Sequence, residues 1–271
     1  MKAVFFLRGW NMGDFFNVML LATLQGIAEF LPISSSGHLV IAQNLLNVNA
    51  PGMRLEVVLH LGTMLSIIAY YRKTLAVLIP GVFRGDRASW TTVAHIAVSA
   101  VPATFFYLLC HDRIDAFYED VRAVGGFLLF TGVVLFVLRW MRRCGDGAVT
   151  GMRALLVGLA QTLAVLPGVS RSGMTIVAAR MAGIAPGAAA EFSFLMSLPL
   201  LAGAVLLDAL KFTPQQGADA LSPGLLLAGA VVSAAVGYAA LTLLVRTLRG
   251  GRFWLFGIYC FAVGAVALLF A

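Results

Sequence analysis

Long apolar segments alternate with short polar loops along most of the chain. Six of these segments reach the roughly 17–25 residues that a helix needs to cross a bilayer core of about 30 Å. The pattern therefore predicts six transmembrane helices, near residues 55–71, 91–110, 121–138, 188–207, 223–245 and 253–271.

Two further apolar stretches, 14–50 and 153–187, are each interrupted midway by Pro, Gly and Ser. Such breaks are tolerated at membrane depth only where the backbone is buried in protein or lines a cavity. We interpret each stretch as a re-entrant helix pair, which enters the membrane and returns to the side from which it came. Broken helices of this kind indicate a binding site.

The distribution of charge agrees with this interpretation. Arginine and lysine residues gather in three loops, which the positive-inside rule places in the cytoplasm: 72–90, 139–153 and 246–252. The more acidic loops 111–122 and 208–222 are then external. This assignment holds only if both broken stretches return to their own side.

Composition sets the class of protein. The chain is 61% hydrophobic and 11% charged, against about 25% charged in a soluble domain, so lipid must be its solvent. Its 271 residues suit a single membrane domain. The net charge of +7 comes from basic residues in the short loops between apolar segments. Membrane topology explains this distribution, so we expect no nucleic-acid partner. Cys110, Cys144 and Cys260 show neither metal-ligand spacing nor a disulfide pattern.

The two broken stretches resemble each other. Ser34-Ser35-Ser36-Gly37 and Ser170-Arg171-Ser172-Gly173 lie 136 residues apart, and the same offset pairs Gln25 with Gln161. Each half then holds one re-entrant pair and three spans, which gives an inverted-topology repeat of about 14–138 and 153–271. Chance similarity between apolar segments is the alternative.

The first loop carries groups suited to phosphate chemistry. Gln25 and Glu29 are four residues apart and share one helix face, Pro32 ends that helix, and the serines Ser34 to Ser36 begin the next. Free N–H groups at a helix start bind phosphate. Next to a phosphate bound there, Ser35 is a candidate nucleophile and His38, about one turn away, is a candidate proton carrier. The alternatives are plain N-capping for the serines and a backbone-bonded core histidine for His38. An intramembrane carboxylate such as Glu29 is by default a functional candidate.

The second loop supplies a cation. Arg171 lies between Ser170 and Ser172 in an apolar stretch, and its guanidinium matches phosphate oxygens bidentately. The alternative is a structural ion pair with Glu29 or Glu191. Two other histidines, His60 and His95, fall on apolar spans, and we expect both to be packing residues.

Three motifs identify a resemblance to the bacterial undecaprenyl-pyrophosphate phosphatase family of the bacitracin-resistance type: Gln25-x-x-x-Glu29, the Pro-x-Ser-Ser-Ser-Gly-His run at 32–38, and the Pro-Gly-x-Ser-Arg-Ser-Gly run at 167–173. The resemblance covers essentially the whole chain. It implies six spans with two re-entrant pairs in the bacterial cytoplasmic membrane, a site open to the periplasm, and a divalent cation, Mg or Ca, held partly by Glu29. Family members carry Glu or Gln at the position of Gln25, and often Thr at that of Ser36.

We therefore predict hydrolysis of undecaprenyl pyrophosphate to the monophosphate carrier of peptidoglycan synthesis, which confers bacitracin resistance. Catalysis is assigned to Ser35, His38, Glu29 and Arg171, with His38 as the rival nucleophile. Substrate binding is assigned to the remaining polar and glycine positions of the motifs: Gln25, Ser34, Ser36, Gly37, Ser170, Ser172 and Gly173.

Two other functions stay open at this point. A transporter or flippase for an anionic lipid or solute would also have an inverted repeat and broken helices. A phosphatase of the acid-phosphatase-like superfamily needs a histidine after the Ser-Arg run, and none follows Arg171. A homodimer is left open as well.

Overall fold

The computed structural model describes residues 12–46, 52–141, 145–210 and 221–270. Regular structure within these ranges is helical, apart from one isolated bridge between Gly147 and Ile184. The helices are α1 (Met12–Phe30), α2 (Ser35–Leu46), α3 (Gly52–Tyr70), α4 (Arg72–Phe83), α5 (Arg87–Phe117), α6 (Val121–Trp140), α7 (Gly151–Leu163), α8 (Arg171–Met181), α9 (Pro186–Leu210), α10 (Pro223–Arg249) and α11 (Leu255–Phe270). Residues 1–11 and most of the predicted 208–222 loop lie outside the described residues.

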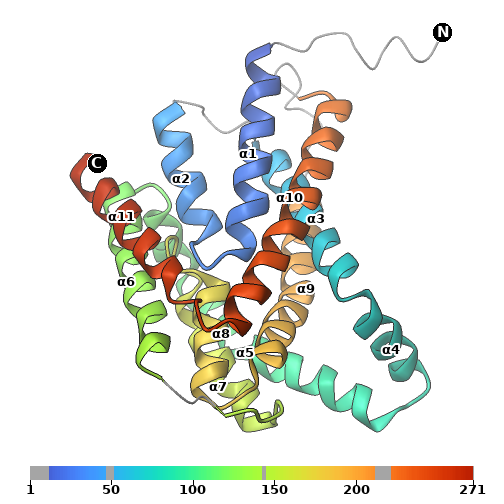
Figure 1. The fold of residues 1–271 in the computed structure, drawn as a ribbon. Coiled ribbons are helices and arrows are strands. Elements are labelled where there is room, and N and C mark those ends of the chain that lie inside the picture. Colours follow the sequence, from blue (N-terminus) through green and yellow to red (C-terminus); the bar gives the residue numbers. More distant parts are fainter. Residues whose placement is uncertain (1–11, 47–51, 142–144, 211–220, 271) are drawn as a thin grey trace, which may run out of the picture.

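Two helical hairpins meet in the middle of the molecule. α1 and α2 descend from one end and turn back, while α7 and α8 rise from the other, so that their tips lie together between the longer helices (Figure 1). Both breaks fall at the predicted prolines. Pro32 cannot donate the hydrogen bond that would continue α1, and Pro167 lies in the turn between α7 and α8.

Helices occupy all six predicted spans, but they differ in length and composition. α5, α6 and α10 are long and apolar enough to cross a membrane, and the count among the described residues is four if α3 and α4 form one bent span. The described part of the chain is therefore that of an all-helical membrane protein, with three or four helices of this kind. The six predicted spans exceed the three or four helices that are long and apolar enough to cross a membrane, so the number six stays a prediction.

The loop predicted at 72–90 is mostly helical. α4 starts at Arg72, is bent by 86° from α3, and has no buried residue. α5 starts at Arg87 because Asp86 caps it, with the carboxylate accepting from Ser89 N at 2.9 Å and Ser89 Oγ at 2.7 Å. Hydrophobic runs alone do not reveal this bend, because α3 and α4 are both apolar.

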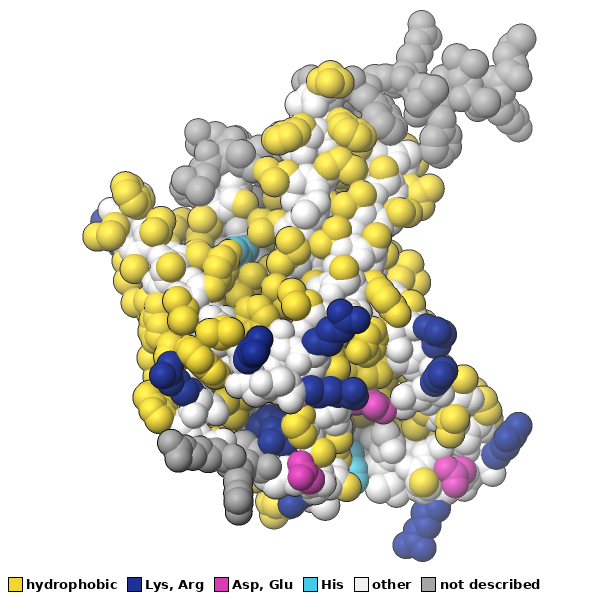
Figure 2. All heavy atoms as spheres, in the orientation of Figure 1, with side chains coloured by type: hydrophobic (Ala, Val, Ile, Leu, Met, Phe, Trp, Pro, Cys, Tyr) yellow, Lys and Arg dark blue, Asp and Glu magenta, His cyan; other side chains and the backbone are white. Residues whose placement is uncertain are grey.

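The surface is that of a protein in lipid. Large apolar side chains are exposed along α5, including Phe105 (63%), Leu108 (66%) and Leu109 (66%). Lys and Arg side chains gather in the lower part of the molecule, around the connections at that end, and apolar side chains cover much of the rest of this face (Figure 2).

Glycines allow close approach between α6 and α11. A Cβ at Gly125 would lie 3.1 Å from the Gly264 carbonyl oxygen, and one at Gly257 would lie 2.9 Å from that of Gly132. The two contacts are one heptad apart on each helix. Small residues at such crossings are typical of helices that associate in lipid, where dispersion forces reward tight packing.

Glycine and serine also meet where the hairpins contact the long helices. A Cβ at Gly26 of α1 would lie 2.9 Å from the Ser233 carbonyl oxygen of α10, and one at Gly158 of α7 would clash with the backbone of Ser99 in α5. The first helix of each hairpin therefore packs in the same manner on a long helix of the other half of the chain. α1 packs on α10, and α7 packs on α5.

One core cluster supports both hairpin tips. It includes Phe30 and Ile33 beside the first break and Ile176 in α8, all at most 4% exposed. Phe30 packs on Phe194 of α9 with ring centroids 5.6 Å apart. This apolar packing holds the polar loops in place.

Candidate active site

The first loop contains an unusual backbone conformation at Ser34, whose φ of +69° is left-handed. A side chain in this region costs roughly 1–2 kcal/mol, and strain of this kind collects at functional sites. In this conformation Ser34 Oγ accepts hydrogen bonds from Gly37 N at 3.3 Å, in its own loop, and from Gly168 N at 3.1 Å, in the second loop.

The second loop is held by α6. The Thr131 hydroxyl donates to the Gly168 carbonyl at 2.9 Å and accepts from Ser170 N at 3.1 Å. Ser170 caps α8, accepting from Gly173 N at 3.1 Å. Gly168 has φ +99°, and a Cβ there would lie 2.6 Å from the Val124 carbonyl oxygen, so only glycine fits.

The two loops touch backbone to backbone. Besides the Ser34 bond to Gly168 N, a Cβ at Gly37 would lie 2.9 Å from the Gly168 Cα. Gly37 therefore permits the contact between the loops, and it does not line the pocket.

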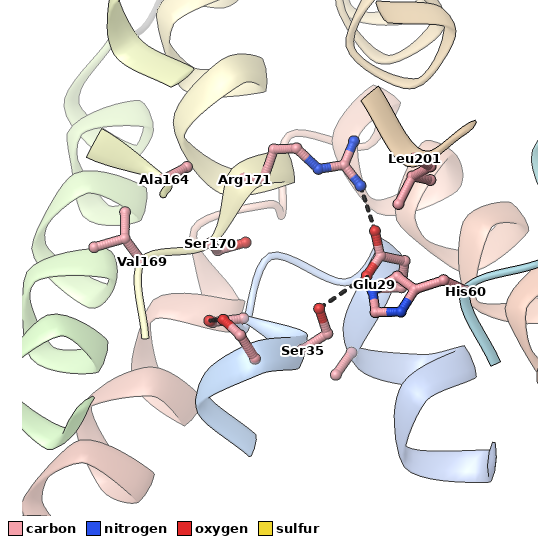
Figure 3. A pocket seen from close by; sticks show the side chains of 11 residues that line it. Glu29, Ser35, His60, Ala164, Val169, Ser170, Arg171 and Leu201 are labelled. Atoms are coloured by element: carbon pink, nitrogen blue, oxygen red, sulfur yellow. Dashed lines mark hydrogen bonds and ion pairs between the residues drawn. The ribbon is translucent and has the colours of Figure 1, made fainter. Parts of the chain in front are cut away.

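Glu29 is the polar centre of the site. Ser35 Oγ donates to its Oε2 at 2.8 Å, and Gln25 Nε2 donates to the same oxygen at 3.2 Å. Arg171 Nη2 forms an ion pair with Oε1 from the opposite loop (Figure 3). The Glu29 side chain is only 5% exposed, so its charge depends on these partners.

A cavity of about 180 Å³ lies against this centre. Its walls come from both loops together with α3 and α9, and they comprise Ala28, Glu29, Ser34, Ser35, Ser36, His60, Ala164, Val169, Ser170, Arg171 and Leu201. Ser35 and Arg171 thus face one cavity, although they come from different hairpins (Figure 3).

Arg171 fits both interpretations given from the sequence. Its ion pair with Glu29 is the structural role, whereas its Nη1 is buried and has no hydrogen-bond partner among the described residues. A buried guanidinium arm without an acceptor is costly, and an anionic ligand that reached it would supply one.

His38 lies away from the cavity. Its Nδ1 is 2.9 Å from the Ser34 carbonyl, and its Nε2 is 2.9 Å from the hydroxyl of Tyr259 in α11. The ring also stacks on Tyr259 with centroids 5.5 Å apart. The backbone-bonded histidine considered from the sequence is therefore what the structure contains.

His60 is the site residue that the sequence analysis missed. It lines the cavity from α3, with Nε2 3.8 Å from Glu29 Oε2, whereas we expected a packing residue. The expectation was wrong because α3 is apolar on most faces, and only its packing beside α1 turns this position toward Glu29. The pairing of a histidine with an intramembrane carboxylate was the available signal.

Three of the remaining predicted residues, Gln25, Ser172 and Gly173, contact residues of the two loops without lining the cavity. Gln25 is fully buried beside Glu29, and its Oε1 has no partner among the described residues. Ser172 donates to the Leu31 carbonyl at 3.4 Å, and Gly173 donates to Ser170; neither lines the cavity.

A divalent cation would find few ligands from the protein. No group of three or more His, Cys, Asp and Glu side chains occurs in the described part of the chain. The Glu29 carboxylate faces the cavity, and its Oε1 accepts from Arg171 alone, which leaves a lone pair for a cation. The donor set fits an ion held by Glu29 together with phosphate oxygens of a bound ligand.

The chain is similar to known proteins over nearly its whole length. The family model described as bacitracin resistance protein BacA matches residues 18–266. The undecaprenyl-diphosphatase of Desulfosudis oleivorans is 38% identical over 92% of this chain and 96% of its own. Those of Desulfatibacillum aliphaticivorans and Halothermothrix orenii are 36% and 35% identical, over 93% and 95% of this chain and 97% and 98% of their own.

Proposed function

The chain belongs to the family of the bacitracin resistance protein BacA, and on this premise we propose that it is an undecaprenyl-diphosphatase. It hydrolyses undecaprenyl pyrophosphate to undecaprenyl phosphate and inorganic phosphate. This activity recycles the lipid carrier for peptidoglycan synthesis and confers resistance to bacitracin. The observation that carries the assignment is the cavity shared by Ser35, Glu29 and Arg171.

Ser35 is the nucleophile of the proposed mechanism. Its hydroxyl already donates to Glu29, which accepts the proton as Oγ attacks the terminal phosphorus in line. The bond from this phosphorus to the bridging oxygen breaks, Glu29 returns the proton to the departing phosphate oxygen, and undecaprenyl phosphate leaves. Water then attacks the phosphoserine while Glu29, again a carboxylate, accepts its proton and passes it to the departing Ser35 oxygen, which releases inorganic phosphate.

Arg171 stabilises the transferred phosphoryl group. Nη2 stays on Glu29, while Nη1, which has no acceptor among the described residues, donates to a phosphoryl oxygen of the bound substrate. The cavity wall at Ser34, Ser36 and Ser170 adds hydroxyl groups around the same oxygens. A divalent cation, Mg or Ca, held by Glu29, would neutralise charge on the pyrophosphate when bound.

His38 supports this reaction without touching the phosphate. Because its Nδ1 faces a carbonyl, which can only accept, Nδ1 carries the proton and Nε2 accepts from Tyr259. The histidine thereby fixes the carbonyl of the strained Ser34. We therefore assign it a positioning role in place of direct proton transfer.

The topology proposed with this function has six spans and two re-entrant pairs in one domain, as inverted repeats of about 14–138 and 153–271. Support comes from the matching contacts of α1 with α10 and of α7 with α5, which an inverted repeat relates. The basic band at one end of the molecule supports a cytoplasmic location for that end, in the bacterial inner membrane (Figure 2). The site then opens toward the periplasm.

Phosphate release from undecaprenyl pyrophosphate by the purified protein in detergent tests the proposal, with and without a chelator. We expect release that chelation abolishes and added Mg²⁺ or Ca²⁺ restores. The rival function is transport of an anionic lipid, which the mirrored helix contacts also fit. No phosphate release, together with lipid movement in vesicles, would reject the enzyme in favour of the transporter.

A further inference from the structure

We propose that His60 is a ligand of the divalent cation, so that this site binds Mn²⁺ through nitrogen as well as oxygen. The inference rests on the proposed function, which places a cation at Glu29. It adds a protein ligand from α3, outside both loop motifs.

The first step is the orientation of the imidazole. His60 Nδ1 lies 2.8 Å from the carbonyl oxygen of Glu56, one helical turn earlier. A carbonyl only accepts, so Nδ1 carries the proton and Nε2 of the neutral ring carries a lone pair. A histidine that ligates a metal almost always donates its other ring N–H in this way, to a backbone carbonyl or a carboxylate.

The second step is where Nε2 points. It faces the cavity, 3.8 Å from Glu29 Oε2, and the His60 side chain is 30% exposed. This separation is too long for a hydrogen bond. It is shorter than the sum of two metal–ligand distances of about 2.1 Å, so one ion can contact both atoms if it replaces the longer of the two hydrogen bonds that Oε2 accepts, the one from Gln25.

The third step is a comparison with His38. Both histidines direct Nδ1 at the carbonyl four residues earlier. The Nε2 of His38 is occupied by the Tyr259 hydroxyl at 2.9 Å, whereas the polar neighbour of the His60 Nε2 is the Glu29 carboxylate. Only His60 therefore presents a lone pair to the cavity, and His38 serves as the matched control.

The chemistry of the ligands determines which ions benefit. Ca²⁺ and Mg²⁺ prefer oxygen ligands, and imidazole favours transition metals. Mn²⁺ accepts carboxylate, phosphate oxygen and imidazole together. We therefore expect this chain to bind Mn²⁺ more tightly than Ca²⁺, and to lose that preference without His60.

Pulsed electron paramagnetic resonance of bound Mn²⁺ tests this ligand directly. We expect a coupling to ¹⁴N in the wild-type protein, replaced by a ¹⁵N coupling when only the histidines are ¹⁵N-labelled. This measurement needs no variant, so a folding defect cannot obscure it. Absence of a histidine nitrogen coupling in wild-type protein with Mn²⁺ bound would overturn the inference.

Variants then identify which histidine is responsible. His60→Gln keeps an oxygen donor, so it should still bind Mn²⁺, about tenfold or more weakly, without the nitrogen coupling. His38→Gln should retain the coupling. A coupling that persists in His60→Gln and vanishes in His38→Gln would overturn the assignment.

Phosphate release in the same preparations separates this inference from the proposed function. Hydrolysis by wild-type protein without a nitrogen coupling would reject His60 as ligand and leave the phosphatase intact. A nitrogen coupling without hydrolysis would reject the phosphatase and leave the metal site.

Discussion

Arg171, the first residue of α8, forms an ion pair with Glu29 in α1, although 142 positions separate them in the chain. The pair joins the two hairpins at the wall of the cavity. One guanidinium arm is thereby used for structure, and the other, Nη1, has no partner in the described part of the protein. Loop packing and, in the proposed reaction, phosphate binding thus depend on one side chain.

Arg171→Ala should lower phosphate release by about 10³-fold or more, because charge on the phosphoryl group loses its counter-charge. Arg171→Lys should recover only part of this loss, since an ammonium lacks the second arm. Turnover in detergent measures both. If Arg171→Ala kept substantial activity with an unchanged unfolding temperature, the arginine would be structural alone.

Ser35→Ala should abolish the phosphoryl-enzyme and reduce turnover by at least about 10³-fold, because the nucleophile is lost. Ser36→Ala is the matched control: it lines the same cavity without a bond to Glu29, and its loss should be mild. Trapping with substrate labelled in the terminal phosphate, followed by mass spectrometry, locates the adduct. Phosphohistidine at His38 would contradict the assignment to Ser35.

Tyr259→Phe should reduce kcat roughly fivefold while KM stays near its wild-type value. One neutral hydrogen bond contributes about 1 kcal/mol, and its loss frees the Nε2 of His38. The stacked ring remains, so the fold should be retained. A change in KM alone would show that Tyr259 contacts the substrate and does not position His38.

Substitutions at Ser34 should follow an unusual order, with stability falling from serine to glycine to alanine. Both changes remove the acceptor for Gly37 N and Gly168 N, but glycine relieves the left-handed φ. We expect Ser34→Gly to be more stable than Ser34→Ala by about 1–2 kcal/mol. Unfolding temperatures in detergent give the comparison, and equal values would mean that φ carries no strain.

Gly168→Ala should destabilise the protein and abolish activity, because a Cβ would meet the Val124 carbonyl oxygen. Gly126→Ala is the control on the same helix as Val124. A Cβ at Gly126 has no neighbour within 4 Å, so this change should be neutral or stabilising by up to about 1 kcal/mol. Similar behaviour of the two variants in thermal unfolding would remove Gly168 as a requirement of the loop contact.

The sequence predicted where the two apolar stretches break, because proline and serine residues interrupt each stretch at the turn. That the two pairs are re-entrant stays a prediction. It also placed Glu29, Ser35 and Arg171 at one site, and these three residues line the cavity, whereas Gln25, Ser172 and Gly173 do not. It did not identify His60, whose position beside Glu29 depends on the rotation of α3 against α1 and is indicated in the sequence only by a histidine on an apolar span. Nor could it predict that His38 would turn to Tyr259, because that partner lies 221 positions away on α11. Contacts between distant helices leave no periodic signal in a single sequence.

The hydrogen bond from Gly168 N to Ser34 Oγ joins the two hairpin tips, so it would have to break in any conformational change that separates them. A transporter of this architecture rocks one repeat against the other, and such rocking would pull the two hairpin tips apart. The nucleophile and the guanidinium would then separate as well. A member of this fold that both cleaved and translocated its lipid would have to do so in alternation, with chemistry confined to the conformation in which the tips are joined.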